Sequence, residues 1–328
     1  MVGWTVAYPQ PGLFAEETNL HFHVEYRLKA GAQRPAIVAA VAAARRAAVS
    51  VHGPNLVIGF SPDLWRSLAP HHAPEAVRPF KAITGENGEV LAPATQYDIW
   101  VWLHGSAYEK VWRTAYDTLL ELEAVSTVEQ EVPAYVAHDN RDSIGFIDGT
   151  ENPVIDEALE VALIPDGQPG AGGSPVFVQK WVHNLKKFDR LPLKAQESVI
   201  GRTRAESIEL PDEIMPETSH VRRNVIVDAN GQELHILRRN TPFATTSEMG
   251  TFFIGCSADP SRIDTMLARM FGVYGDGLID DLTRFSKPVT GSYYFVPAMD
   301  ALTEVFGPLA TGDDDADEPL HHEVTDGL

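Results

Sequence analysis

Residues 145–153, with the sequence GFIDGTENP, place one carboxylic acid between apolar residues and glycines. The two apolar residues before Asp148 favour burial, and a buried carboxylate needs a bonded partner or a chemical role such as proton transfer. Glycines such as Gly149 suit a sharp turn or the close approach of a flat ligand. Two interpretations remain open: a buried acid that faces a ligand, or a tight turn with a solvated Asp148 and a helix cap at Thr150.

A second stretch, residues 234–240 (LHILRRN), has the composition of a strand that carries charge. Side chains alternate along a strand, so Ile236, Arg238 and Asn240 share one face. If that face points inward, Arg238 is a buried cation and needs a partner such as Asp148. If it faces solvent, its charge is ordinary. The local pattern leaves both possibilities open.

The 12 histidines are candidate ligands, but local sequence does not choose among them. His220 follows an acidic loop in PETSHVRRN, whereas His183 and His235 lie in apolar strands. His21 and His23 would share one face of a strand, where a metal site needs further ligands and a polar strand face is the simpler interpretation. A single histidine is more often structural than a ligand.

The composition limits which classes of protein the chain can belong to. It has 328 residues, a net charge of −20 and a pI near 4.9, which disfavours nucleic acid and anionic membranes as partners. No apolar stretch is long enough to span a bilayer, and the N-terminus lacks an export signal, so a cytoplasmic location is expected. The single cysteine, Cys256, excludes an internal disulfide and attachment of haem through CxxCH; it is expected in the core.

Hydrophobic periodicity predicts the elements that must position these side chains. The first half alternates strand, helix, strand, short helix, strand, helix and strand, over residues 19–27, 35–49, 55–60, 61–68, 97–104, 106–124 and 125–135. This is the ferredoxin-like order. The second half repeats it loosely, with strands at 175–182, 234–239, 250–257 and 291–297 and helices at 194–200 and 260–271.

These elements predict an α+β fold of two ferredoxin-like units with antiparallel sheets. The units are expected at residues 1–140 and 141–310, with the boundary near residues 137–141. The stretch 145–153 then lies close to the junction, where ligand pockets are common. Residues 311–328 contain the charge run DDDADEP and are expected to form a disordered acidic tail.

Five segments, in this order, resemble those of the dye-decolourising peroxidases, most of all the bacterial B-type subgroup. They are GFIDGTENP at 145–153, IGRTRAESIEL at 200–210, SHVRRN at 219–224, LRRN at 237–240 and RFSKPVTGSYYFVP at 284–297. The resemblance covers nearly all of residues 5–305. It implies a pair of ferredoxin-like units with a haem pocket in the second, in agreement with the strand order deduced from the pattern.

The resemblance implies non-covalent haem b with His220 as the proximal ligand of the iron. Asp280, in IDDLTRF, matches the acid that bonds the other imidazole nitrogen, and Asp281 is the alternative if the register differs by one residue. Gly149 would lie beside the cofactor. Arg202 would pair with a haem propionate.

Asp148, Arg238 and Asn240 would lie on the distal side, where hydrogen peroxide binds. Asp148, or water that it holds, would move a proton between the peroxide oxygens, and Arg238 would stabilise the charge on the leaving oxygen. At ~4 Å and an effective dielectric constant of about 20, two unit charges interact by ~4 kcal/mol, so Arg238 is expected to contribute more than Asp148.

The resemblance implies a peroxidase that oxidises dyes, phenols or other small reductants through a ferryl intermediate. Electrons could pass through aromatic residues, of which the candidates are Trp102, Trp181, Tyr293 and Tyr294. Alternatives are a porphyrinogen oxidase, a deferrochelatase-like enzyme that removes iron from haem, or a haem-binding or storage protein. A homo-oligomer is expected. B-type relatives can enter encapsulin shells through a C-terminal extension, so an encapsulin partner is considered, although the tail here is acidic.

Overall fold

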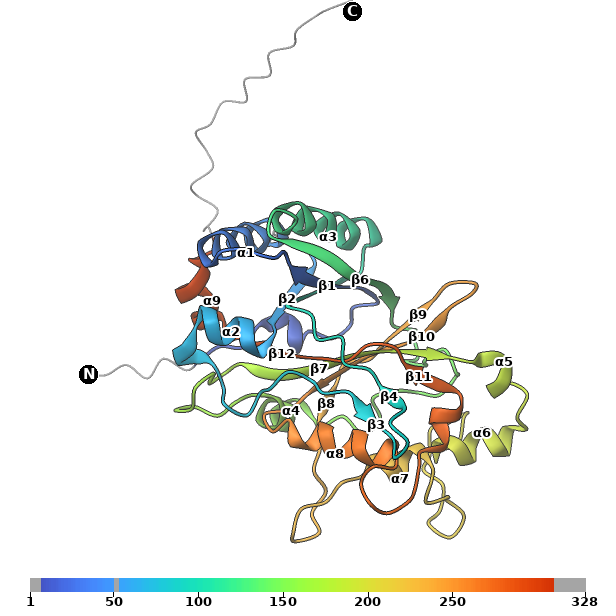
Figure 1. The fold of residues 1–328 in the computed structure, drawn as a ribbon. Coiled ribbons are helices and arrows are strands. Elements are labelled where there is room, and N and C mark those ends of the chain that lie inside the picture. The colour runs from blue at the N-terminus through green and yellow to red at the C-terminus, as the bar shows by residue number, and fades with distance from the viewer. Residues whose placement is uncertain (1–6, 50–52, 310–328) are drawn as a thin grey trace, which may run out of the picture.

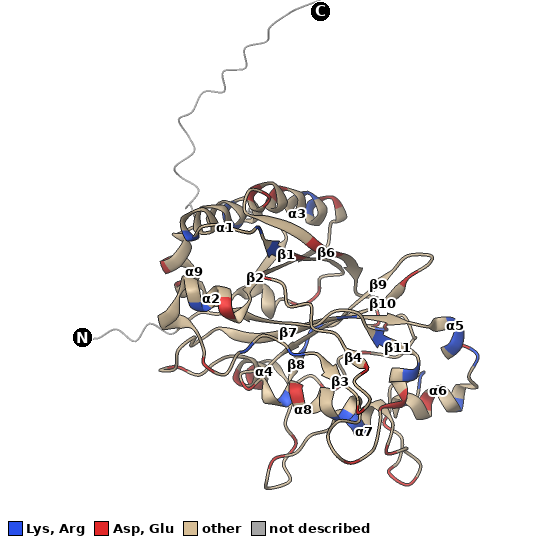
Figure 2. Ribbon diagram, viewed as in Figure 1, with Lys and Arg blue, Asp and Glu red and all other residues tan. Residues whose placement is uncertain are grey.

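The computed structural model describes residues 7–49 and 53–309 (Figure 1). The expected acidic tail, 311–328, lies outside these residues. Within them, one 10-stranded sheet runs through the centre of the molecule, with helices above and below it in Figure 1. Figure 2 places most charged residues on the helices and loops around the sheet, and β7 and β12 at its centre are nearly free of charge. No helix in the described part of the chain is long and apolar enough to cross a bilayer.

The first half of the chain forms four strands in the order β6-β1-β5-β2. The elements are β1 (Leu20–Leu28), α1 (Arg34–Ala48), β2 (Asn55–Phe60), α2 (Pro62–Leu68), β5 (Ile99–Gly105), α3 (Tyr108–Leu122) and β6 (Ser126–Tyr135), with the 3-10 turns η1 (Pro11–Leu13) and η2 (Pro70–His72) and the hairpin β3 (Ile83–Thr84) and β4 (Val90–Ala92). The first and third strands pair at the centre, as the ferredoxin-like order requires.

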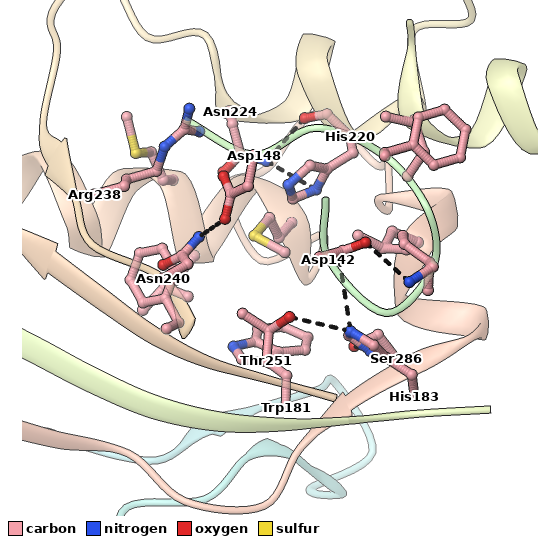
Figure 3. Close-up of a pocket in the computed structure, with 18 of the residues that line it drawn as sticks. Asp142, Asp148, Trp181, His183, His220, Asn224, Arg238, Asn240, Thr251 and Ser286 are labelled. Carbon is pink, nitrogen blue, oxygen red and sulfur yellow. Dashed lines mark hydrogen bonds and ion pairs between the residues drawn. The ribbon is translucent and has the colours of Figure 1, made fainter. Parts of the chain in front are cut away.

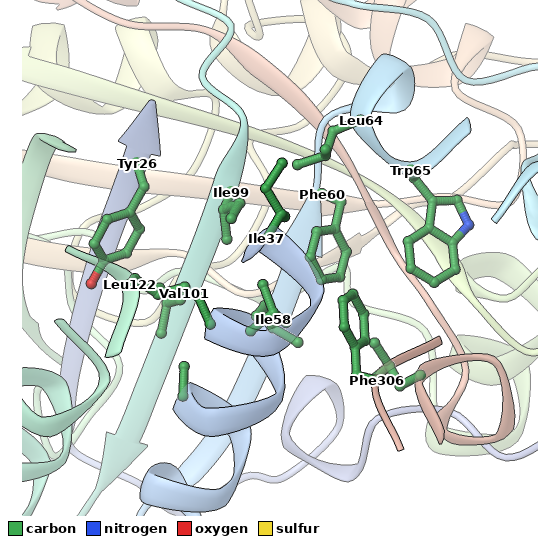
Figure 4. Packing of buried hydrophobic residues seen from close by; sticks show 14 of the residues in the cluster. Tyr26, Ile37, Ile58, Phe60, Leu64, Trp65, Ile99, Val101, Leu122 and Phe306 are labelled. Atoms are coloured by element: carbon green, nitrogen blue, oxygen red, sulfur yellow. The ribbon is translucent and has the colours of Figure 1, made fainter. Parts of the chain in front are cut away.

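Helices α1 and α3 cover the outer face of this half. Helix α1 is alanine-rich and begins next to a proline, which favours a helix start. Its apolar residues Ile37, Val41 and Ala44 recur at helical spacing and pack on strand residues such as Ile58 and Val101 (Figure 4). Helix α2 begins after Ser61, whose side chain accepts a hydrogen bond from the Leu64 N–H as expected for a cap.

The second half repeats the strand order as β12-β7-β10-β8. Its elements are α4 (Ile155–Ala162), β7 (Ser174–His183), α5 (Leu185–Phe188), α6 (Leu193–Ile200), α7 (His220–Asn224), β8 (Leu237–Arg238), β9 (Thr241–Ala244), β10 (Met249–Cys256), α8 (Ser261–Met270), η3 (Asp281–Arg284), β11 (Ser286–Pro288), β12 (Ser292–Val296) and α9 (Met299–Phe306). The expected α+β class and ferredoxin-like architecture are therefore confirmed.

The sheets of the two halves are joined, which the sequence pattern did not predict. Strand β12 pairs with β2 through Phe295 and Phe60. An aromatic and aliphatic layer fills the space between the two halves and contains Trp100, Trp102 and Phe252. The inner face of β1 is therefore buried, and the polar face expected there lies inside the protein.

The end of the described chain returns to the first half. Helix α9 packs against α1, and the Phe306 ring lies 5.4 Å from the Phe60 ring. Cys256 is buried, as expected. The boundary near residues 137–141 stays a prediction. The strand expected at 234–239 is shorter, since only Leu237 and Arg238 form β8; α4, β9, β11 and α9 lacked a clear pattern in the sequence.

Candidate active site

A pocket lies between β7 and β10 on one side and α6, α7 and α8 on the other (Figure 3). Its volume is about 160 Å³, and it adjoins a second cavity of about 230 Å³ that shares Asp148, His220 and Arg238 with it. Most of its wall is apolar, formed by Ile144, Phe146, Ile147, Trp181, Ile200, Ile236, Phe253, Ile263, Met266, Leu267, Met270 and Leu282. The polar residues of this wall are Asp142, Asp148, His183, His220, Asn224, Arg238, Asn240, Thr251 and Ser286.

His220 enters the pocket from the first position of α7. Ser219 caps this helix, and its side chain accepts a hydrogen bond from the Arg222 N–H. Gly201 ends α6 with a φ of +97°, and a Cβ there would meet Val221 at 3.0 Å. A larger residue would therefore push α6 away from the helix that carries His220.

Two neighbouring acids, Asp280 and Asp281, were candidates for the bond to His220, and distance selects Asp280. Asp280 is fully buried, and its Oδ2 lies 2.7 Å from His220 Nδ1. Its other oxygen accepts from the Leu282 N–H, which fixes the carboxylate. Asp281 instead bonds Thr218 and Arg284. Since a carboxylate accepts, His220 Nδ1 carries the hydrogen, and the Nε2 lone pair is free to bind a metal ion.

Asp148 lies on a turn that lines the same pocket. Its Oδ1 accepts from the Gly149 N–H and its Oδ2 from Asn240 Nδ2, each at 2.7 Å. The Asn240 Oδ1 accepts from the Ile254 N–H, so the orientation of that amide is fixed. Asp148 is partly buried and lies on a tight turn that faces a cavity, which combines parts of both interpretations. The helix cap expected at Thr150 is wrong, because α4 begins at Ile155 after Val154.

Asn152 ties this turn to strand β8. Its Oδ1 accepts from the Arg238 N–H at 2.9 Å, and its Nδ2 donates to the Arg238 carbonyl at 2.8 Å. The side chain thus pairs with the strand as another backbone would. This arrangement explains how the Asn-Pro end of GFIDGTENP holds Asp148 and Arg238 in fixed relation.

Arg238 faces the pocket with Ile236 and Asn240, as strand alternation predicted. Leu237 and Arg239 point to the other side, where the Arg239 guanidinium lies over the Trp102 ring. Among the described residues, the Arg238 guanidinium makes no hydrogen bond or ion pair. Arg238 is only partly buried, and the pairing with Asp148 that a fully buried Arg238 would need is not made, because Asn240 donates to that carboxylate instead.

Arg202 lies at the rim, in the adjoining cavity. Its guanidinium forms ion pairs with Glu151 and with Glu209, the latter at 2.7 Å. It also donates to the Ser207 carbonyl. Its charge is thus already balanced by two carboxylates whose side chains are about half exposed, at 50% and 49%.

A second polar cluster was missed by the sequence analysis. His183 Nδ1 lies 2.7 Å from Ser286 Oγ, and His183 Nε2 lies 3.3 Å from Thr251 Oγ1 and 4.0 Å from Asp142 Oδ2. Burial, and secondarily the nearby Asp148, raises the pKa of Asp142 to about 7. Burial lowers the pKa of His183 to about 4. Only the strand position of His183 gave any signal, because its partners come from distant segments.

The four candidate relay residues lie in different places. Trp181 lines the pocket, stacked on Phe271. Tyr293 packs on the same side of the sheet, whereas Trp102 and Tyr294 lie in the layer between the two halves. All four are buried, so none forms a surface site by itself.

Comparison with known proteins identifies the family. The model of the N-terminal domain of Dyp-type peroxidases matches residues 23–133, and that of the C-terminal domain matches residues 139–301. A dye-decolorizing peroxidase of Mycobacterium tuberculosis is 37% identical over 251 residues, which cover 76% of this chain and 74% of that protein. The chain therefore belongs to the Dyp-type peroxidase family and is an enzyme of the dye-decolourising peroxidase type.

Solved structures agree with this assignment. The encapsulated DyP-type peroxidase from Mycobacterium smegmatis is 32% identical with a TM-score of 0.84, covering 93% of this chain and 100% of that one. A variant of DypB from Rhodococcus jostii RHA1, in complex with heme, is 30% identical with a TM-score of 0.80, covering 92% and 98%.

Proposed function

We propose that the chain binds haem b non-covalently and uses hydrogen peroxide to oxidise dyes, phenols or other small reductants. The observation that carries the proposal is the arrangement of three groups around one apolar pocket: a histidine bonded to a carboxylate through Nδ1, an aspartate held by two donors, and a guanidinium without a partner among the described residues. A haem complex of a solved relative supports the choice of cofactor.

The residues present fit a haem. The group is flat and largely apolar with two carboxylates at one edge, and the pocket is apolar inside and polar at its rim. His220 would bind the iron through Nε2, and Gly149 would lie beside the ring. Arg202 would meet a propionate, provided that the exposed Glu151 or Glu209 turns away from it.

Bound haem would supply the two-electron reduction of peroxide and single-electron oxidation of reductants. The chain's own task on the proximal side is to fix the imidazole. Asp280 holds the hydrogen on Nδ1 and so keeps Nε2 available, and a carboxylate at this position makes the imidazole a stronger donor. Complete burial of Asp280 prevents water from competing for this bond.

On the opposite side, Asp148 would take a proton from one peroxide oxygen and return it to the other. Both of its present partners are donors, which fix the two carboxylate oxygens at the pocket wall. Positioned acid–base groups typically contribute roughly 10²–10⁴-fold in rate. Asn240 would hold Asp148 in place during the transfer.

Arg238 would stabilise the negative charge that develops on the leaving oxygen. Its guanidinium is not neutralised by any carboxylate of the described residues, so its field is directed at the pocket. Two unit charges at ~4 Å interact by ~4 kcal/mol if the dielectric constant is about 20. This energy is larger than the barrier reduction that corresponds to roughly a 10²-fold rate increase, the lower limit for one acid–base group. We infer that Arg238 contributes more than Asp148.

The rate of peroxide reaction tests this order. Arg238→Leu and Asp148→Ala are loaded with haem, and the fall of the resting absorption band after peroxide addition is followed by stopped flow. Both variants are expected to react more slowly, with Arg238→Leu the slower because it removes the positive charge that would stabilise the leaving oxygen. Arg113→Leu, on exposed α3, controls for loss of an arginine and is expected to match the wild type.

Four outcomes contradict the proposal, three of them in part and the last as a whole. A faster Arg238 variant than Asp148 variant reverses the order of the two residues. Haem binding without any peroxide reaction favours a haem-storage protein. Release of iron, or oxidation of porphyrinogens in preference to phenols, favours the deferrochelatase-like or porphyrinogen oxidase alternative. A purified protein that takes up no haem contradicts the proposed function as a whole.

Partners other than peroxide and reductant are also proposals. The solved relative from Mycobacterium smegmatis is encapsulated, which supports an encapsulin shell as a partner of this chain. The tail that would mediate this contact lies outside the described residues. Co-expression with an encapsulin, followed by size-exclusion chromatography, tests both loading and the expected homo-oligomer.

A further inference from the structure

Three aromatic rings form a buried column between the two halves of the sheet. The Trp102 and Trp100 rings of β5 lie 5.8 Å apart at 20°, and the Trp100 and Tyr294 rings lie 6.0 Å apart at 22°. All three side chains are completely buried. We call Trp102, Trp100 and Tyr294 the aromatic column; two of its members, Trp102 and Tyr294, are among the candidate relay residues.

The column ends at a buried carboxyl group. The Tyr294 hydroxyl donates to Glu25 Oε1 at 2.8 Å. Glu25 is only 1% exposed, and its second oxygen meets no donor at hydrogen-bond geometry among the described residues; the Ser292 hydroxyl is the other polar group beside this carboxyl. Burial of a carboxyl group is costly unless it is hydrogen-bonded, and the Tyr294 hydroxyl supplies such a bond. The hydrogen bond gives the phenolic proton a direct acceptor.

The groups around the column favour the loss of an electron at its Tyr294 end. The Arg239 guanidinium lies 5.5 Å from the centre of the Trp102 ring, and a neighbouring cation makes oxidation of that ring harder. The Trp100 Nε1 has no hydrogen-bond partner in the described part of the chain, so an oxidised Trp100 has nowhere to release its proton. Tyr294 alone combines ring contact with a carboxylate acceptor.

The column begins one strand away from the active-site pocket. Thr251 and Phe253 of β10 line the pocket, and Phe252 between them points to the other face. The Phe252 ring stacks on His23 at 4.2 Å, and His23 lies 5.7 Å from Trp102. An electron could therefore cross β10 from the column to the pocket.

We propose that Tyr294 and Glu25 form an internal redox site, which takes one oxidising equivalent from the peroxide-oxidised enzyme when no reductant is available. Tyr294 loses one electron to the oxidised cofactor, which is reduced by one electron. The Tyr294 O–H bond breaks and its proton forms a new O–H bond on Glu25, giving a neutral tyrosyl radical and a neutral acid. This inference rests on the proposed function.

Burial supports this assignment. Desolvation raises the pKa of Glu25 to about 7, well above that of an exposed glutamate, so its carboxylate is a good proton acceptor. Desolvation also holds the pKa of Tyr294 well above its usual value, so the phenol keeps its proton until it is oxidised. Because the whole column is buried, it stores the equivalent rather than delivering it to bulky dyes.

The test uses haem-loaded protein mixed with peroxide without reductant, frozen at set times and examined by electron paramagnetic resonance. Above the pKa of Glu25, the wild type is expected to give a tyrosyl signal. Tyr294→Phe is expected to lose it, and Glu25→Gln to reduce it several-fold, because glutamine cannot take the proton. Trp100→Phe is expected to slow its appearance. In Glu25→Gln, peroxide turnover with a small reductant is expected to stay near the wild-type value.

Tyr293→Phe is the matched control. Tyr293 is the neighbouring buried tyrosine, and its hydroxyl also donates to a carboxylate, Asp264, at 2.8 Å, but it lies on the other face of the sheet. A tyrosyl signal that disappears in Tyr293→Phe and persists in Tyr294→Phe overturns the proposal, as does an unchanged signal in folded Glu25→Gln. If peroxide does not oxidise the wild type at all, the proposed function fails instead.

Discussion

The two halves of the molecule share a strand order but differ in how the first strand connects to the second. In the first half, β1 reaches β2 through the single long helix α1, which packs on the sheet (Figures 1 and 4). In the second half, β7 reaches β8 through the short helices α5, α6 and α7 and the loops between them. The first half is closed by a continuous apolar core, whereas the second contains the pocket.

The difference shows where chemistry can be placed on a repeated architecture. A long amphipathic helix buries one stripe and leaves no room beside the strands. Short helices expose their first turns and loops to the interior, and His220 stands at the start of such a helix. The same topology therefore supports two roles. We call the half from β1 to β6 the structural half and the half from β7 to β12, which contains the pocket, the chemical half; the functional residues lie in the connections of the latter.

The largest expected effect is the loss of haem binding and activity, and it comes from one residue of the chemical half. His220→Ala removes the only proposed iron ligand, so haem retention and peroxidase activity are expected to fall to background while the circular dichroism spectrum stays native. His235→Ala is a matched control, because its side chain is 30% exposed, as is that of His220, and also lines the rim. Equal haem loss in both variants would show that His220 is not the ligand.

The next effect is expected in the structural half. Leu103→Ala removes a completely buried side chain from the core that α1 and α3 cover. Such a truncation typically costs about 2–5 kcal/mol in the free energy of unfolding. Urea denaturation measures this loss, and the absorption spectrum of bound haem is expected to stay unchanged. A shifted spectrum would mean that the two halves are coupled more tightly than their separate cores suggest.

The contrast between the halves also explains what the sequence could predict. Period-2 and helical patterns are local, so β1, α1, β5, α3 and β7 were found within a few residues. Local patterns do not predict the burial of His21 and His23, because the other half of the sheet covers that face. The choice of Asp280 over Asp281 and the Asp142–His183 contact also depend on segments far apart in the chain, which spacing cannot reveal.

A smaller effect is expected from the carboxylate behind His220. Asp280→Asn keeps the shape but removes the charge that fixes the imidazole, and changes of this type commonly cost 10–100-fold in metal affinity or activity. Haem dissociation to an apo-globin acceptor and the peroxide reaction rate measure the loss. Asp281→Asn, which alters only contacts to Thr218 and Arg284, is the control. A larger effect from Asp281→Asn would reverse the assignment.

The smallest effect concerns Asp142, in the pocket wall of the chemical half. Burial raises the pKa of Asp142 to about 7, so the Asp142 carboxyl group binds its proton more tightly in the folded protein than in the unfolded chain. The group therefore favours folding at low pH, and its contribution becomes unfavourable as pH rises from about 4 towards 7. Asp142→Asn cannot ionise, so its free energy of unfolding relative to wild type is expected to increase across this window, by at least about 1 kcal/mol.

The pKa of the neighbouring His183 is shifted in the opposite direction. Its effect on stability is present in wild type and variant alike, so the difference between the two reports on Asp142. Burial lowers the pKa of His183 to about 4, so it destabilises the fold as pH falls below about 6.5 in both wild type and variant, and its effect largely cancels in the difference. Urea denaturation at a series of pH values gives that difference. Glu86→Gln, an exposed position, is expected to show no such slope. A flat difference for Asp142→Asn would mean that the pKa of Asp142 is the same in the folded protein as in the unfolded chain.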